Sequence, residues 1–266
     1  MRYKKKIFDR EGDYGSGNNQ EEDSRIIEGR NAVLEAFRSG RTIDRLLIQS
    51  GCQDGPVLTI KREAAKQGTV IDFVAKERLE QISPTGKHQG VIAYGAAYEY
   101  ASVEDILEAA RAKNEDPFLL ILDNIEDPHN LGAIIRTANL AGAHGVIIPK
   151  RRAVGLTSTV ARTSAGALNY TPVARVTNIG NTIEELKKEG IWFVCADMDA
   201  KPMYQQNLTG PIGLVIGNEG EGVSRLVKEK CDFTASIPMK GNIDSLNASV
   251  AAGILAYEIV RQRSFQ

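Results

Sequence analysis

The sequence contains few of the residues from which disulfide frameworks, metal centres and membrane spans are built. Its three cysteines are scattered and odd in number, which argues against a disulfide framework and favours a reducing compartment. Neither the cysteines nor the three histidines show the spacing of a zinc site, so we predict no metal. No apolar run approaches the roughly 18 residues that a membrane-spanning helix requires.

A basic excess is also missing. The formal net charge is −1, whereas nucleic-acid-binding domains usually carry a strongly positive charge. Any contact with RNA or DNA must therefore come from local patches of lysine and arginine. The basic residues near the start of the sequence run at once into an acidic, glycine- and asparagine-rich stretch. We therefore expect no signal peptide and predict a cytoplasmic protein.

The distribution of apolar residues predicts two folded domains, as the length of 266 residues also suggests. Residues 1–24 have no hydrophobic periodicity and are predicted to form a disordered tail. Residues 25–97 are predicted to form a small α/β domain, and residues 98–116 a linker with one charged helix at 103–113. In the small domain we expect helices at 31–37, 57–67 and 76–82 and strands at 45–49, 69–74 and 90–94.

Residues 117–266 are predicted to form a second, larger α/β domain. Strands are expected at 118–122, 145–148, 191–196, 212–216 and 233–237, and helices at 131–141, 181–189, 223–230 and 248–262. Strands alternate with helices, and several strands are continuous apolar runs. We therefore predict a mostly parallel sheet that is covered by helices on both faces.

Three apolar strands of this domain run directly into polar loops, at residues 119–132, 212–222 and 237–249. The carboxyl ends of parallel strands share one edge of the sheet, and α/β proteins bind their ligands there. The sequence therefore predicts a ligand site assembled from these three loops.

The first loop leads into a helix that carries one isolated arginine. Asn130 is a candidate N-cap of this helix. Leu131, Ile134 and Ala138 fall on one helical face, which must pack against the core. Arg136 lies about 200° round the helix from Ile134 and therefore points away from that core. It is either a solvated surface residue or an arginine directed at an anionic substrate, and the pattern leaves both open.

The second loop, residues 217–222, combines three glycines with two glutamates. It lacks the lysine of a Walker phosphate loop and does not match the dinucleotide pattern GxGxxG, and its carboxylates would repel a pyrophosphate. The glycines instead permit close backbone approach to a flat, uncharged group. The alternative is a tight strand-to-helix turn without a ligand, in which Glu219 only accepts backbone N–H bonds.

The third loop ends at Ser245-Leu-Asn-Ala-Ser249 and opens the last predicted helix. Asn247 can cap this helix. The helix has small residues on one side, which suit close packing against another helix or a second subunit: Ala248, Ala251, Ala252, Gly253 and Ala256.

These three segments resemble the three motifs of the SpoU/TrmH branch of the SPOUT methyltransferases. They read Asn130-Leu-Gly-Ala-Ile-Ile-Arg136, Leu214-Val-Ile-Gly-Asn-Glu-Gly220 and Ile237-Pro-Met-x-Gly-x-x-x-Ser-Leu-Asn-x-Ser249, in the family's order and spacing. Ile27-Glu-Gly-Arg-Asn-Ala-Val33 and His88-Gln-Gly-Val91 are similar to the RNA-binding domain, itself like ribosomal protein L30e, of the 23S rRNA guanosine-2'-O-methyltransferase subgroup. The resemblance covers residues 25–263.

The resemblance implies S-adenosylmethionine as methyl donor, a trefoil-knotted catalytic domain and a homodimer. It implies a cofactor pocket lined by backbone at Gly217, Ile237 and Leu246, with Met239 and Ser245 nearby. It also implies a polar catalytic set: Asn130, Arg136, Glu219, Ser245, Asn247 and Ser249.

Arg136 is the residue that the resemblance marks as the activator of a ribose 2'-hydroxyl. A guanidinium normally stays protonated in proteins, so it is a poor proton acceptor. We therefore predict that Arg136 binds an RNA phosphate and stabilises developing alkoxide charge.

RNA contacts are predicted for residues of both domains. Lys150, Arg151 and Arg152 follow a strand end, where a ligand-facing loop belongs, although a solvated charge run is the alternative. The other candidates are Arg162 and Arg175 in the second domain and Arg30 and His88 in the first.

The leading hypothesis is an S-adenosylmethionine-dependent ribose 2'-O-methyltransferase that acts on a guanosine of 23S rRNA. A tRNA ribose or another rRNA ribose is the alternative target, and the N-terminal domain favours rRNA over tRNA. A non-catalytic RNA-binding or ribosome-assembly protein is the alternative class. The intact Arg136, Glu219 and Asn247 favour the enzyme.

Overall fold

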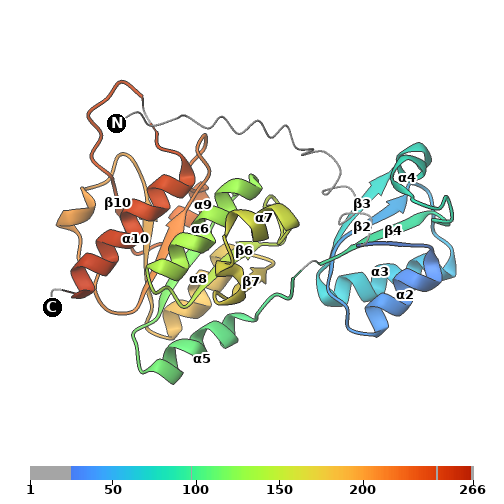
Figure 1. Ribbon diagram of the computed structural model, residues 1–266, viewed down its shortest axis with the longest axis horizontal. Helices are drawn as coiled ribbons and strands as arrows, with labels where there is room; N and C mark the ends of the chain where they lie inside the picture. The colour runs from blue at the N-terminus through green and yellow to red at the C-terminus, as the bar shows by residue number, and fades with distance from the viewer. Residues whose placement is uncertain (1–24, 97, 244, 265–266) are drawn as a thin grey trace, which may run out of the picture.

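A computed structural model describes residues 25–96, 98–243 and 245–264. The predicted tail at 1–24 lies outside these residues. Figure 1 shows two lobes, each built on a β-sheet of its own: four strands in the first lobe and six in the second.

The first lobe is a mixed sheet with helices on both faces. Its strand order is β1-β4-β2-β3, with β4 antiparallel to β1 and β2, and β2 parallel to β3. Val33 and Ile60, from α2 and α3, are fully buried on one face, and Leu79 of α4 is buried on the other. The strands are β1 Ile26–Glu28, β2 Ile43–Gln49, β3 Val70–Val74 and β4 Val91–Gly95, and the helices are α2 Arg30–Arg38, α3 Gly55–Gln67 and α4 Lys76–Ile82.

Helix α5, Val103–Lys113, joins the two lobes and packs on the second. Ser102 and Asp105 form a capping box at its start. Ile106 and Leu107 are buried in one of the two cores of the second lobe.

The second lobe contains a six-stranded sheet of order β10-β8-β9-β5-β6-β7, in which every described pair of neighbours is parallel. The prediction of an α/β fold with a mostly parallel sheet is confirmed. The strands are β5 Phe118–Leu122, β6 Gly145–Pro149, β7 Val173–Val176, β8 Trp192–Ala196, β9 Ile212–Ile216 and β10 Phe233–Ala235. The helical segments are α6 Pro128–Leu140, α7 Ser158–Thr163, η1 Ala167–Asn169, α8 Ile179–Lys188, η2 Met203–Gln205, α9 Arg225–Lys228 and α10 Ala248–Ser264.

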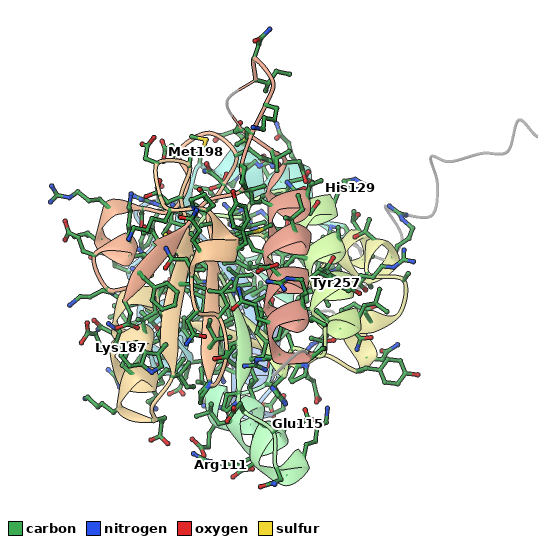
Figure 2. All side chains as sticks on the ribbon, turned by 90° about the vertical axis from the view of Figure 1, so that its left-hand side faces the viewer. Arg111, Glu115, His129, Lys187, Met198 and Tyr257 are labelled. Carbon is green, nitrogen blue, oxygen red and sulfur yellow. The ribbon has the colours of Figure 1, made fainter. Side chains whose placement is uncertain are left out.

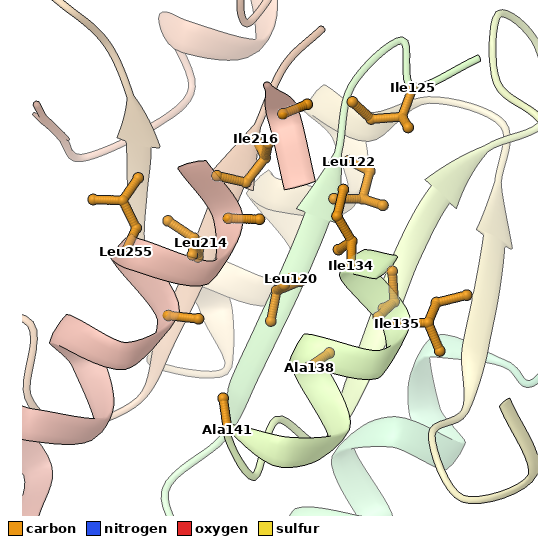
Figure 3. Packing of buried hydrophobic residues seen from close by; sticks show 14 of the residues in the cluster. Leu120, Leu122, Ile125, Ile134, Ile135, Ala138, Ala141, Leu214, Ile216 and Leu255 are labelled. Carbon is orange, nitrogen blue, oxygen red and sulfur yellow. The ribbon is translucent and has the colours of Figure 1, made fainter. Parts of the chain in front are cut away.

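Helices cover both faces of this sheet, which explains why β5, β6 and β9 are buried at every residue. Figure 3 shows α6 and α10 on one face, where Ile134 and Leu255 pack against Leu120 and Leu214 of the central strands. Helices α5 and α8 bury Ile106 and Ile183 on the other face.

The structure differs from the predictions at a few places. Strands β1 and β7 were not predicted, because β1 has three residues and Arg175 interrupts the apolar run of β7. The prediction that Asn130 caps the following helix is wrong. Helix α6 begins at Pro128, and the side chain of Asp127 accepts the capping bond from His129 N at 2.9 Å. The trefoil knot stays a prediction.

Candidate active site

The three predicted loops meet at the carboxyl edge of the six-stranded sheet. From β5 the chain moves outward through β6 and β7, and it later returns to the other side of β5 through β8, β9 and β10. The edge beside β5 is therefore a topological switch point, where open α/β sheets bind ligands. Figure 2 shows His129 and Met198, which follow β5 and β8, at one end of the lobe, and Arg111 and Glu115 at the opposite end.

Glu219 connects the three loops. Its Oε1 accepts hydrogen bonds from Asn130 Nδ2 and from Asn247 Nδ2, both at 2.7 Å. Asn247 Nδ2 also donates to Asn130 Oδ1 at 2.9 Å. Asn130 follows β5, Glu219 follows β9, and Asn247 follows β10. The structure therefore brings together three of the six residues predicted to form the catalytic set, in one hydrogen-bonded triangle.

Asn247 also starts helix α10. Its Oδ1 accepts from Ser249 N at 3.0 Å, from Ser249 Oγ at 2.6 Å and from Val250 N at 3.4 Å. These bonds satisfy N–H groups that have no partner within a helix. Ser249, another predicted catalytic residue, therefore contacts the triangle through Asn247.

A cavity of about 220 Å³, here called the inner cavity, lies beside this triangle. Its apolar floor includes Ile216, Ala235 and Leu255, and Glu219 lies on its wall. All five residues predicted to bind a cofactor line it: Gly217, Ile237, Met239, Ser245 and Leu246.

Gly217 is required by a close approach of two backbone segments. A Cβ atom at this position would lie 2.0 Å from the carbonyl carbon of Gly222 and 2.2 Å from Val223 N. The loop folds back on itself, with Gly222 N donating to Asn218 O at 3.0 Å. Glycine therefore shapes this wall of the inner cavity.

An ion pair between Lys228 and Asp197 lies on another wall of the inner cavity. Burial alone would raise the pKa of Asp197, but the hydrogen bond and charge of Lys228 bring it below its usual value. Lys228 in turn has a raised pKa, chiefly because it donates to Asp197. The inner cavity therefore has an apolar floor with charged groups at its sides.

A second cavity of about 630 Å³, here called the outer cavity, adjoins the inner one. Residues 218–221 line both. Other residues line the outer cavity but not the inner one, including Asn124, Glu126, Asn130 and Arg152. Because Glu219 lines both, it lies at the boundary between the two cavities.

Arg136 lines neither of these cavities. It is exposed on α6, on the side away from the core, as the helical pattern predicted. Within the chain itself, the structure therefore leaves Arg136 apart from the triangle.

The two RNA-contact candidates of the first lobe are occupied by neighbours. Arg30 pairs with Asp54 at 2.7 Å and donates from Nε to Gln89 O at 3.0 Å. His88 is buried, and its Nδ1 accepts from Gly90 N at 3.0 Å. Burial leaves little of the His88 ring for RNA, so its described role is to hold the turn before β4.

Arg175 and Lys150 connect the two lobes. Arg175 Nη1 contacts Asp44 Oδ1 at 2.6 Å, and the Arg175 side chain is only 13% exposed. Lys150 Nζ donates to Gln67 O at 3.1 Å. The prediction of direct RNA contact had not anticipated this use of Arg175, because its partner lies 131 positions away in the sequence.

The remaining basic candidates, Arg151, Arg152 and Arg162, are exposed. Arg151 and Arg152 make no ion pair with any residue that the structure describes. Arg152 lines the outer cavity, and Arg151 precedes it in the sequence.

Two features of the site were missed from the sequence. Buried Asp123 accepts from Ser224 N at 2.8 Å and thus ties the loop after β5 to the loop after β9. The Lys228–Asp197 pair was not predicted, because neither residue belongs to a motif. A carboxylate directly after the apolar run of β5 was the available signal for Asp123.

Among the described residues, no group of three or more His, Cys, Asp and Glu side chains is arranged to hold a metal ion. Over the same part of the chain, no helix combines the length and the apolar character needed to cross a membrane.

Each lobe matches a known protein family. Residues 117–257 match the SpoU rRNA Methylase family, and residues 26–101 match the family described as RNA 2'-O ribose methyltransferase substrate binding. The TrmH-family protein YacO of Bacillus subtilis (strain 168) is 53% identical over 90% of this chain and 96% of its own length.

Solved structures of SpoU and TrmH/SpoU proteins are similar to this chain as well. The SpoU methyltransferase AviRb from Streptomyces viridochromogenes, in complex with the cofactor AdoMet, superposes with a TM-score of 0.58 and 26% identity over 94% of this chain and 96% of its own. The TrmH/SpoU tRNA modifying enzyme of A. aeolicus superposes with a TM-score of 0.51 and 30% identity over 56% of this chain and 77% of its own.

Proposed function

The chain belongs to the SpoU rRNA methylase family of RNA methyltransferases, and from this premise we propose that it methylates a ribose 2'-hydroxyl of RNA. We propose S-adenosylmethionine as the donor and a guanosine of 23S rRNA as the target. The match of residues 26–101 to a ribose methyltransferase substrate-binding family supports the 2'-hydroxyl. The AdoMet complex of AviRb supports the donor.

The observation that carries this proposal is the pair of cavities that meet at Glu219. The inner cavity fits the donor by its chemistry, because its apolar floor suits adenine and Gly217 allows close backbone approach. Ile237, Leu246 and the backbone at Gly217 would hold the adenosine portion, and Ser245 would offer a hydroxyl. The outer cavity is large enough for a nucleoside.

When bound, S-adenosylmethionine supplies an electrophilic methyl group on its sulfonium, so we propose that the transfer needs no metal. The chain's part is orientation and management of one proton. Glu219 Oε1 is occupied by the two asparagine amides, whereas Oε2 accepts no bond from any described residue. We assign Oε2 to accept a hydrogen bond from the ribose 2'-hydroxyl, while Asn130 and Asn247 hold the carboxylate in place.

We further propose a homodimer formed through the outer surface of α6 and α10. Leu140 is 65% exposed there, Val250 47% and Tyr257 50%. Figure 2 shows Tyr257 on the outer surface of α10. The opposite side of α10 is buried in the core, so this helix has apolar side chains on its exposed side as well as on its buried side. Such a helix is usually covered on every side.

The same surface includes Arg136, one helical turn before Leu140. A second subunit seated there would cover Arg136 and bring it close to a neighbouring set of loops. In that position its guanidinium would bind an RNA phosphate and stabilise the alkoxide that develops as the 2'-hydroxyl passes its proton to the Glu219 carboxylate.

A tRNA ribose is the second candidate target, favoured by the likeness to the tRNA modifying enzyme of A. aeolicus. That likeness covers 56% of this chain, whereas the substrate-binding match adds the first lobe. We therefore favour rRNA, and we propose a cytoplasmic location, where rRNA and tRNA are both available.

Three measurements test the proposal. Titration calorimetry with S-adenosylmethionine should give heat for one site per chain, and enzyme treated with EDTA should still methylate RNA. Mapping of 2'-O-methylation in the rRNA and tRNA of a deletion strain should show one lost site. A strain that keeps every ribose methyl group would refute the proposed activity.

A further inference from the structure

A third cavity, here called the interdomain groove, lies between the two lobes and has a volume of about 910 Å³. Seven lysines and arginines line it, against three aspartates and glutamates. The chain as a whole has a net charge of −1. The groove is therefore a local patch of positive charge. An RNA-binding protein without an overall basic excess needs such a patch.

Both lobes contribute cations to the groove. Arg45, which pairs with Asp72 of β3, and Arg78 come from β2 and α4 of the first lobe. Arg151 and Arg152 come from the loop after β6 of the second. A polyanion lying in the groove would contact both walls at once. Neither Arg45 nor Arg78 was among the predicted RNA contacts.

The groove leads into the active site. Glu126 and Arg152 line both the groove and the outer cavity, and residues 218–221 line both the outer and the inner cavity. A strand that follows the groove therefore reaches Glu219 without leaving the surface of the protein.

Arg152 has a backbone conformation that supports a function at this junction. Its φ is 56°, in the left-handed region that residues other than glycine rarely occupy. Such conformations are unfavourable and tend to occur at functional sites. Here the conformation belongs to the arginine that stands where the groove opens into the outer cavity.

The floor of the groove suits unpaired bases. Val70, Val74 and Tyr94 of the first-lobe sheet line it and are partly exposed. Aromatic and apolar side chains bind bases that have been turned out of a stack, whereas a duplex offers mainly phosphates and hydroxyls. The combination of cations on both walls with an apolar floor therefore favours single-stranded RNA over duplex.

A buried ion pair fixes the two walls relative to each other. Asp44 of β2 and Arg175 of β7 are both largely buried, and the Arg175 guanidinium lies 5.3 Å from the centre of the Tyr100 ring. Tyr100 accepts from Leu156 N at 2.9 Å. The spacing of the two walls is thus set by the contact between Asp44 and Arg175, which themselves line the groove, whereas Arg151 and Arg152 make no ion pair with a described residue and are available to a ligand.

We propose that the interdomain groove binds a single-stranded segment of the RNA substrate and directs its target ribose through the outer cavity to Glu219. This inference rests on the proposed function and adds the path and the strandedness of the substrate. Arg45 and Arg78 form one wall of the path, and Arg151 and Arg152 form the other.

The test compares three double variants that each remove two positive charges. Arg45→Gln with Arg78→Gln alters the first wall, and Arg151→Gln with Arg152→Gln alters the second. Arg62→Gln with Lys188→Gln is the matched control, because both residues are exposed, one lies in each lobe, and neither lines any of the three cavities. The probes are a fluorescein-labelled unstructured RNA of about 12 nucleotides and a duplex of the same sequence, followed by anisotropy over a range of salt concentrations.

Each wall variant should lower the slope of log K against log salt by about 1.4, since each phosphate contact to a single strand contributes about 0.7. At physiological salt this corresponds to about tenfold weaker binding of the single strand. The control should bind like wild type. Arg152→Gly should weaken RNA binding without lowering the melting temperature, because glycine relieves the left-handed backbone while removing the cation.

Other outcomes would overturn the inference. Equal losses in the wall variants and the control would mean that only overall charge matters. Undiminished RNA binding by both wall variants would assign the groove to another partner, such as a protein. Losses as large for duplex as for single strand would refute the strandedness. All variants should bind S-adenosylmethionine like wild type, and a wild type that binds neither the donor nor RNA would instead refute the proposed function.

Discussion

Replacing Gly217 by alanine should damage the active site by moving backbone, without removing any side chain. The added Cβ would lie 2.0 Å from the carbonyl carbon of Gly222, 2.1 Å from its oxygen and 2.2 Å from Val223 N. Carbon atoms in contact normally lie at about 3.5 Å or more, so this loop would have to move by about 1.5 Å. No rotamer change can relieve the clash, because all three atoms belong to the backbone.

The expected loss of stability combines two effects. Overpacking of this kind costs about 1–3 kcal/mol, and the displaced turn would lose the hydrogen bond from Gly222 N to Asn218 O, at about 1 kcal/mol. The sum is about 2–4 kcal/mol. For a domain of this size the melting temperature should fall by about 5 to 15 °C. Since the displaced backbone at Gly217, Gly222 and Val223 lines the inner cavity, donor affinity should fall at least about tenfold as well.

The same loop provides a matched control. At Gly220 an added Cβ would meet only Asn218 Oδ1, at 3.8 Å, which is an ordinary contact. Gly220→Ala should therefore change the unfolding free energy by no more than about 0.5 kcal/mol. Denaturant unfolding and calorimetry with S-adenosylmethionine would measure both variants. If Gly217→Ala unfolds and binds like wild type, the backbone crossing is wrong; if both variants lose equal stability, loss of glycine flexibility rather than the clash is responsible.

Three further predictions concern separate parts of the molecule. Arg136→Ala should bind S-adenosylmethionine normally but transfer no methyl group, as measured by calorimetry and by incorporation of labelled methyl into RNA; unchanged turnover would exclude both proposed roles of this arginine. If the proposed homodimer forms, Tyr257→Glu should weaken it by about a hundredfold or more, because the substitution would bury an unpaired carboxylate at the proposed interface; Tyr204→Glu, at an exposed residue of η2, should leave it unchanged, and light scattering would tell the two apart. Burial lowers the pKa of His144 below its ordinary 6.5, although Glu115 opposes this, so the folded state holds the neutral ring. The resulting stability is complete above about pH 6.5 and is lost as the pH falls toward the folded pKa, and His144→Gln should flatten the dependence of melting temperature on pH in that range.

The sequence was informative where a single segment decides the outcome. Strands β5 and β9 begin and end where their continuous apolar runs predicted, because strands buried on both faces admit few polar residues. The error at the start of α6 was avoidable. Asp127 followed by Pro128 is a common N-cap and first-turn pair, and it preceded the chosen Asn130 by three residues.

Long-range pairings could not be predicted in the same way. Asn130 and Glu219 are 89 positions apart, and Asn247 and Asn130 are 117 apart, so composition and periodicity carry no trace of their contact. The positions of the three loops after apolar strands predicted that the loops meet, and only the resemblance of the three motifs singled out these residues within them. The burial of Arg175 against Asp44 was hidden for the same reason, since an arginine in a short edge strand suggests exposure as readily as a bridge between lobes.

The triangle of Glu219, Asn130 and Asn247 has a consequence for biosynthesis. Its last member is made about thirty residues after Glu219, and a nascent polypeptide that has not yet emerged past Asn247 holds only two of the three corners. During translation the second lobe can thus acquire most of its sheet while Ser245 and Leu246, which line the inner cavity, are still inside the exit tunnel. Premature termination shortly before that point would remove one corner of the triangle together with helix α10, which buries Ala252, Leu255 and Ile259 in the core, so the site is complete only once α10 has docked.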